Sequence, residues 1–239
     1  MLLWIAATAV AFFVKGLCGF ANTLVFTSIL AFGTPNAGIS PVELLLGYPT
    51  NLILAWRNRS RLRRKIVVPM TLLVLAGSVP GAFLLKNTDS GLIRTVFGAV
   101  AVLAGVDMLL RSPDRQRAKG RKLVLGIIGV LSGLLCGLFG AGVLLAAYVG
   151  RTTDTGDEFK ANICAVFAAE NTFRIVLYSL IGIITPGGVK QAALLAPVML
   201  AGLYAGIKSA GALDDGTVKR LVTVLLILSG IAMIVMNIR

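Results

Sequence analysis

The residues most able to do chemistry are charged side chains that lie inside long apolar stretches. Lys15 directly precedes a glycine-rich run, and Arg174 follows Glu170 by four residues within the apolar segment 160–183. The i, i+4 spacing places Glu170 and Arg174 on one face of a helix. Charges in such surroundings are costly and usually face a cavity or a partner. Two interpretations stay open: an internal ion pair that only holds helices together, or Arg174 as an anion ligand with Glu170 as its gate or proton carrier.

Glycine-rich runs interrupt two of the apolar stretches. The first run contains Gly16 and Gly19, and it is followed by Asn22 and Thr23, which are good N-caps for a new helix. Because glycine tolerates the positive φ of a tight reversal, we expect the chain to turn here and to begin a second half-helix. Free N–H groups at a helix N-terminus bind anions. The alternative is that the glycines only let helices pack closely.

The second interruption repeats this arrangement later in the chain. The anion-binding residues expected from both interruptions and from the charged pair are Lys15, Gly16, Gly19, Asn22, Thr23, Gly137, Gly140, Gly142, Asn171 and Arg174. Lys15 has an alternative role, since a lysine can extend its ammonium group to the membrane surface. Glu43 lies near the end of an apolar segment and is expected at the interface. Cys18 and Cys136 adjoin the glycine runs, as small hydrophobic side chains or as contacts for a soft sulfur anion.

The composition of the whole chain is that of a membrane protein. Of 239 residues, 57% are hydrophobic and only 14% are charged, and the mean hydropathy is +0.90. Soluble domains carry roughly 25% charged residues, whereas one membrane crossing takes about 20 apolar residues. Apolar segments are expected at 2–31, 41–56, 66–85, 91–110, 122–149, 160–183, 190–208 and 217–237.

The net charge of +13 is concentrated in two basic runs, 57–65 and 111–122, which lie between apolar segments. Such clusters set membrane topology and contact anionic headgroups, so they predict a lipid bilayer, and not nucleic acid, as the partner. The sequence has no histidine, no metal-binding spacing of its three cysteines and no ATP-binding loop. It therefore predicts neither an enzyme nor a bound cofactor or metal.

Collinear glycine blocks indicate an internal duplication. Residues 16–21 align with 137–142, residues 75–77 align with 200–202, and Asn51 corresponds to Asn171. We therefore predict an all-α polytopic membrane protein of two homologous halves, each with one glycine-broken helix and three transmembrane helices. The divisions are 1–111 for the first repeat, 112–122 for a basic cytoplasmic linker and 123–239 for the second repeat.

The broken helices have two possible topologies. If each crosses the membrane once, the halves lie parallel; if each enters and leaves on the same side, the halves are inverted. The second arrangement places a larger share of the Lys and Arg residues on one side of the membrane, as the positive-inside rule requires. We therefore favour inverted repeats with re-entrant broken helices.

Three motifs, in order, resemble those of the TauE/SafE family of membrane transporters. Residues 13–25, FVKGLCGFANTLV, resemble the opening motif, and residues 132–142, SGLLCGLFGAG, are similar to the second motif. The stretch from Lys219 to Gly230 resembles the C-terminal pattern. The resemblance implies transport of small anions, notably sulfite, organosulfonates and related sulfur oxyanions, across a bacterial inner membrane.

These observations lead us to expect a secondary transporter of a small sulfur-containing anion, present as a multi-pass protein of the bacterial inner membrane. The anion is expected near the membrane centre between the two broken helices, where Arg174 and backbone N–H groups supply positive potential. A passive anion channel and a transporter of a different small carboxylate are the alternatives. Homo-oligomerisation stays open, because apolar outer faces look alike whether they meet lipid or another protomer.

Overall fold

The computed structural model describes residues 1–30, 36–87, 122–139, 142–153 and 155–210, together with short pieces between 95 and 106 and between 223 and 235. Within these ranges the chain forms helices joined by turns, and the prediction of an all-helical protein is confirmed. The main elements are α1 (Leu2–Cys18), α2 (Asn22–Leu30), α3 (Asn36–Arg57), η1 (Arg59–Arg61), α4 (Arg64–Asn87), α6 (Lys122–Phe139), α7 (Val143–Thr152), α8 (Gly156–Leu180) and α9 (Pro186–Ala210).

The helices follow the predicted apolar segments closely. Each of the two long stretches is divided into two helices, α1 with α2 and α6 with α7. Within the described ranges, three helical stretches are long and apolar enough to cross a membrane: Arg64–Leu84, Gly156–Leu180 and Pro186–Ala210. The predicted segments 91–110 and 217–237, and all of the linker except Lys122, lie wholly or largely outside the described residues.

A glycine in the left-handed conformation ends α1. Gly19 has a φ of 86°, and its N–H donates to the carbonyl of Lys15 at 2.7 Å. Ala21 is also left-handed, with a φ of 70°, which costs an L-residue roughly 1–2 kcal/mol. The predicted reversal therefore exists, but it lies at 19–21, whereas Gly16 is helical and belongs to α1. Strained backbone of this kind is typical of functional sites.

Close glycine contacts join each broken helix to a helix of the other half of the sequence. α1 packs along α9, and α6 packs along α4. A Cβ added to Gly206 of α9 would lie 2.1 Å from the carbonyl oxygen of Phe13, and one added to Gly133 of α6 would lie 2.1 Å from that of Val74. The paired backbones therefore touch, which is the close packing that small residues permit between membrane helices.

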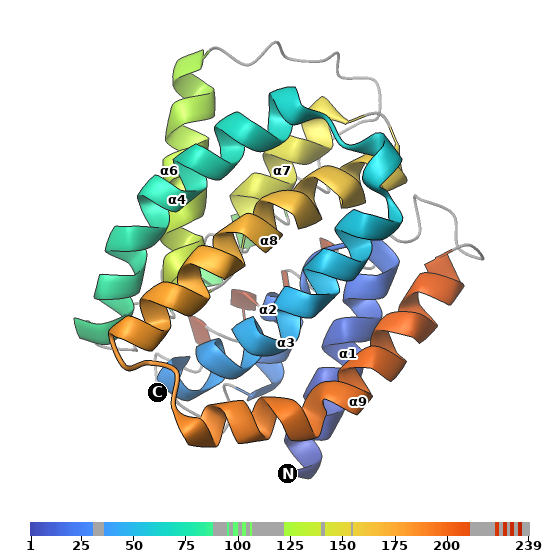
Figure 1. Ribbon diagram of the computed structural model, residues 1–239, viewed down its shortest axis with the longest axis vertical. Coiled ribbons are helices and arrows are strands. Elements are labelled where there is room, and N and C mark those ends of the chain that lie inside the picture. Colours follow the sequence, from blue (N-terminus) through green and yellow to red (C-terminus); the bar gives the residue numbers. More distant parts are fainter. Residues whose placement is uncertain are drawn as a thin grey trace.

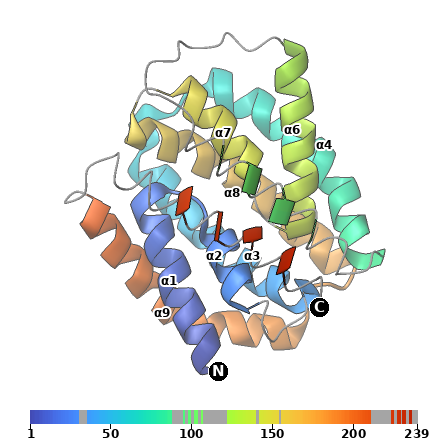
Figure 2. The ribbon, with the colours of Figure 1, turned by 180° about the vertical axis from the view of Figure 1, so that it is seen from behind.

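The two broken helices enter the molecule from opposite ends. α1 runs inward from the end marked N and α2 returns toward it, whereas α6 runs inward from the far end and α7 returns there (Figures 1 and 2). Between them α3 and α8 pack side by side and run in opposite directions. This arrangement brings the beginning of α2 and Gly142, the residue before α7, to the same interior space.

Candidate functional site

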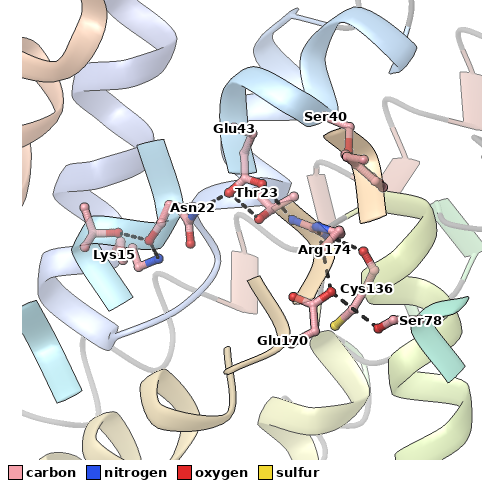
Figure 3. A network of polar contacts seen from close by, with 12 residues as sticks. Lys15, Asn22, Thr23, Ser40, Glu43, Ser78, Cys136, Glu170 and Arg174 are labelled. Carbon is pink, nitrogen blue, oxygen red and sulfur yellow. Dashed lines mark hydrogen bonds and ion pairs between the residues drawn. The ribbon is translucent and has the colours of Figure 1, made fainter. Parts of the chain in front are cut away.

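A buried carboxylate connects the start of α2 to the centre of the protein. Glu43 of α3 accepts hydrogen bonds on Oε1 from the side-chain amide of Asn22 and, at 2.8 Å, from the hydroxyl of Thr23. Its side chain is only 3% exposed. The expectation that Glu43 lies at an interface is therefore wrong: the carboxylate is enclosed by α2 and α8 (Figure 3).

Arg174 lies between two carboxylates. Its Nη2 is 3.8 Å from Oε2 of Glu43, and its Nε is 3.7 Å from Oε1 of Glu170. Its Nη1 also donates to the carbonyl of Cys136. The hydroxyl of Ser78 donates to Oε1 of Glu170 at 3.4 Å, which adds α4 to the network (Figure 3). The ion pair between Glu170 and Arg174 exists as the spacing predicted, and it is extended by Glu43.

Lys15 is the second buried cation of the site. Its side chain is 1% exposed, and its Nζ donates to the carbonyl of Gly47 at 3.4 Å. The ammonium group also lies 6.0 Å from the centre of the Phe12 ring. This burial is inconsistent with the alternative in which Lys15 extends to the membrane surface.

A small cavity lies where these elements meet. It borders the first residues of α2 and Gly142, the residue before α7, so two helix N-termini reach the same space. Unsatisfied N–H groups at helix N-termini carry a partial positive charge. The residues lining the cavity are Lys15, Phe20, Ala21, Asn22, Thr23, Leu24, Glu43, Asn51, Gly142, Phe167 and Asn171.

The two asparagines that correspond in the sequence alignment both line this cavity. Asn51 of α3 and Asn171 of α8 are 2% and 5% exposed. The Oδ1 atom of Asn51 has no hydrogen-bond partner in the protein. Because an amide can rotate to present either its oxygen or its NH₂ group, Asn51 can offer two donors to a bound group. An unsatisfied buried polar atom costs about 1–3 kcal/mol, which favours a polar occupant of the cavity.

The structure separates the predicted site residues into three groups. Lys15, Asn22, Thr23, Gly142 and Asn171 line the cavity, whereas Arg174 and Glu170 lie behind Glu43 and are absent from the described lining. The remaining predicted residues are the glycines Gly16, Gly19, Gly137 and Gly140.

These glycines differ in role. Gly16 packs on the backbone of α9, where an added Cβ would lie 2.5 Å from the carbonyl oxygen of Leu203, so its packing role is established. Gly19 forms the turn between α1 and α2. Gly137 is helical in α6, and Gly140 lies outside the described residues.

The thiols of Cys18 and Cys164 donate hydrogen bonds to backbone carbonyls. Cys18 donates to the carbonyls of Val14 and Phe20, and Cys164 donates to that of Gly19 at 3.2 Å. These bonds hold the turn at the end of α1 in place. Among the described residues, no three His, Cys, Asp or Glu side chains gather closely enough to hold a metal ion.

The charges of the site are balanced. Two buried cations, Lys15 and Arg174, accompany two buried carboxylates, Glu43 and Glu170. Isolated buried charges are unfavourable, so this balance is what a stable membrane interior requires. The arrangement can attract a small anion to the helix N-termini beside Lys15. Arg174 does not line the cavity and is separated from it by Glu43.

Comparison with known families is consistent with this arrangement. Residues 4–233 match the family described as Sulfite exporter TauE/SafE. The chain belongs to this family. No curated protein and no solved structure matches the chain. Membership in TauE/SafE, together with the apolar helices, confirms the predictions of a membrane protein and of transport.

Proposed function

We propose that the protein is a secondary transporter of small sulfur-containing anions, among which sulfite, thiosulfate and organosulfonates are the substrate class. The observation that carries the proposal is that two helix N-termini, Lys15 and the paired asparagines line the same cavity. Helix N-termini and a buried ammonium group together favour an anion. Three oxygen atoms of a sulfite or sulfonate group could accept hydrogen bonds from Lys15, Asn51 and Asn171 at once.

The depth of the cavity supports a site near the middle of a bilayer. α2 has nine residues and α7 has ten, so each helix is about 14–15 Å long, roughly half of the 30 Å hydrocarbon thickness. If each returns to the membrane surface on its own side, both N-termini lie near the midplane. Non-helical backbone at this depth is tolerated where it lines a cavity, as residues 19–21 would.

We further propose that the two halves are inverted repeats and that α1–α2 and α6–α7 are re-entrant. Two observations support this topology: α1 and α6 run in opposite directions, and each packs along a helix of the other half, α1 along α9 and α6 along α4. Alternating access would come from rocking of one half against the other around the anion. A multi-pass position in the bacterial inner membrane, with the basic run 57–65 facing the cytoplasm, follows from the positive-inside rule.

Anion binding to Lys15 is the first test of this function. The unfolding temperature of the detergent-purified protein is measured with sulfite, thiosulfate, methanesulfonate and sulfoacetate, with acetate and chloride for comparison. A ligand of the folded state raises that temperature. We expect at least one sulfur anion to do so. A charged hydrogen bond contributes about 1.5–3 kcal/mol, so Lys15→Met should weaken binding roughly ten- to hundredfold.

The matched control is Lys190→Met on α9, which removes the same charge from an exposed position. It should bind the anion as the unchanged protein does. The absence of stabilisation by every sulfur anion, or equal binding by Lys15→Met, would contradict the proposed site. Counterflow in proteoliposomes separates a transporter from a channel: saturable exchange of labelled for unlabelled anion is expected, whereas a large conductance without exchange would indicate the channel.

A further inference from the structure

The carboxylate of Glu43 occupies the same donors that an anion at α2 would use. Its Oε1 accepts hydrogen bonds from the side chains of Asn22 and Thr23, the first two residues of α2. Glu43 also lines the cavity. An ionised Glu43 therefore competes with a bound anion for these donors and repels it across a short distance in a medium of low dielectric constant.

The charge balance of the site leads to the same difficulty. Lys15 and Arg174 already offset Glu43 and Glu170, so a bound monoanion would leave one uncompensated negative charge in the protein interior. An unpaired buried charge costs several kcal/mol. One proton added to Glu43 removes this charge and converts the carboxylate into a hydroxyl donor that can face the anion.

We propose that Glu43 takes up one proton from the accessible aqueous side when the anion binds, and releases it when the anion leaves, so that proton and anion move together. This inference rests on the proposed function and names the coupling ion for the same site. The proton joins a carboxylate oxygen of Glu43, and no other bond is formed or broken. Arg174, freed from part of its attraction to Glu43, then contributes its positive potential to the anion.

Glu43 is better placed for this role than the other ionisable groups that face it. Among the described residues these are Lys15 from α1, Glu170, Arg174 and Tyr178 from α8, and Cys136 from α6. Lys15 lines the cavity but carries the charge that attracts the anion. Glu170 is bound by Arg174 and Ser78 and is absent from the lining. Of the carboxylates that the structure describes near the cavity, Glu43 alone contacts both α2 and Arg174.

The test measures anion affinity against pH in the purified full-length chain. Sulfite, thiosulfate and methanesulfonate are the probes. For each probe, the slope of the logarithm of the dissociation constant against pH is compared between the unchanged protein and Glu43→Gln, so that ionisation of the probe itself cancels. Binding that takes up a proton weakens as pH rises above the range where the free site holds that proton. The dissociation constant should then rise about tenfold more per pH unit in the unchanged protein than in Glu43→Gln.

Two further variants identify the carboxylate that takes up the proton. Glu170→Gln and Glu158→Gln make the same chemical change, the second at the beginning of α8, where Glu158 pairs with Arg63. Glu158→Gln should keep the slope of the unchanged protein, whereas Glu170→Gln removes one charge of the balance and tests whether Glu170, and not Glu43, holds the proton. Loss of the slope in Glu170→Gln with retention in Glu43→Gln would overturn the assignment.

A pH-indicator dye in weakly buffered solution provides a measurement that needs no variant. With methanesulfonate, about one proton per bound anion should leave the solution, and no uptake would overturn the proposal even if Glu43→Gln failed to fold. If none of the probes binds, the proposed function fails. If a probe binds without proton uptake, the proposed function stands and only the coupling by Glu43 is rejected.

Discussion

Two glycines on the same helix should respond in opposite ways to the same substitution. Gly133 and Gly126 both lie in α6. A Cβ added to Gly133 would lie 2.1 Å from the carbonyl oxygen of Val74 and 2.8 Å from the Cα of Gly77, whereas one added to Gly126 meets nothing within 4 Å. Cβ contacts below 3.0 Å are essentially never observed, so Gly133→Ala must push α4 and α6 apart by about 1 Å.

The expected loss of folding stability in Gly133→Ala follows from that displacement. A gap of about 0.5–1 Å removes a quarter to a half of each dispersion contact, and overpacking a close interface costs about 1–3 kcal/mol. For a chain of this size, 1 kcal/mol corresponds to about 2–4 °C. We therefore expect Gly133→Ala to lower the unfolding temperature by roughly 2–12 °C. Gly126→Ala should leave it unchanged or raise it slightly, since alanine exceeds glycine in helix propensity by about 1 kcal/mol.

Thermal unfolding of the purified protein in one detergent, followed by intrinsic fluorescence and by loss of the monodisperse chromatographic peak, measures both variants. Gly206→Ala provides the equivalent change at the contact between α9 and α1, where a Cβ would lie 2.1 Å from the Phe13 carbonyl oxygen. It should be destabilised to a similar degree. If Gly133→Ala is as stable as Gly126→Ala, the backbone contact between α4 and α6 does not exist as described.

Further predictions concern the turn and the charged network. Gly19→Ala should lose roughly 1–2 kcal/mol of folding free energy, because an L-residue must adopt the φ of 86°; unchanged thermal stability would exclude the left-handed turn. Arg174→Met should lose about 3–5 kcal/mol, since it leaves two buried carboxylates without their cation. Adding Glu43→Gln and Glu170→Gln to Arg174→Met should restore most of the stability, and a triple variant no more stable than the single one would contradict the network.

The helices and the charged pair on α8 were predictable because their signals are local. Apolar runs of sufficient length give membrane helices, and the spacing of Glu170 and Arg174 gives an ion pair on one helix face. The presence of a break near Gly19 was also predictable, since the glycine run is followed by Asn22 and Thr23, which are the first two residues of α2. The role of Gly16 was not, because a helical glycine that contacts another helix and a glycine that forms a turn have the same local sequence.

Glu43 was misplaced for a different physical reason. Its position near the end of an apolar segment indicates an interface, and its partners are far away in the chain. Asn22 and Thr23 precede it by 21 and 20 residues, and Arg174 belongs to a helix of the other half of the sequence. Only the packing of α3 against α2 and α8 brings these groups together, and the periodic pattern of a single segment cannot predict this packing.

The location of a bound anion tests the central claim most directly. Selenite, the heavier analogue of sulfite, is introduced into crystals of the protein, and its anomalous scattering marks its position. We expect one strong peak in the cavity, between the first turn of α2 and Gly142 and within hydrogen-bonding distance of Lys15. An empty cavity with selenite only on the exposed basic run 57–65 would contradict the account.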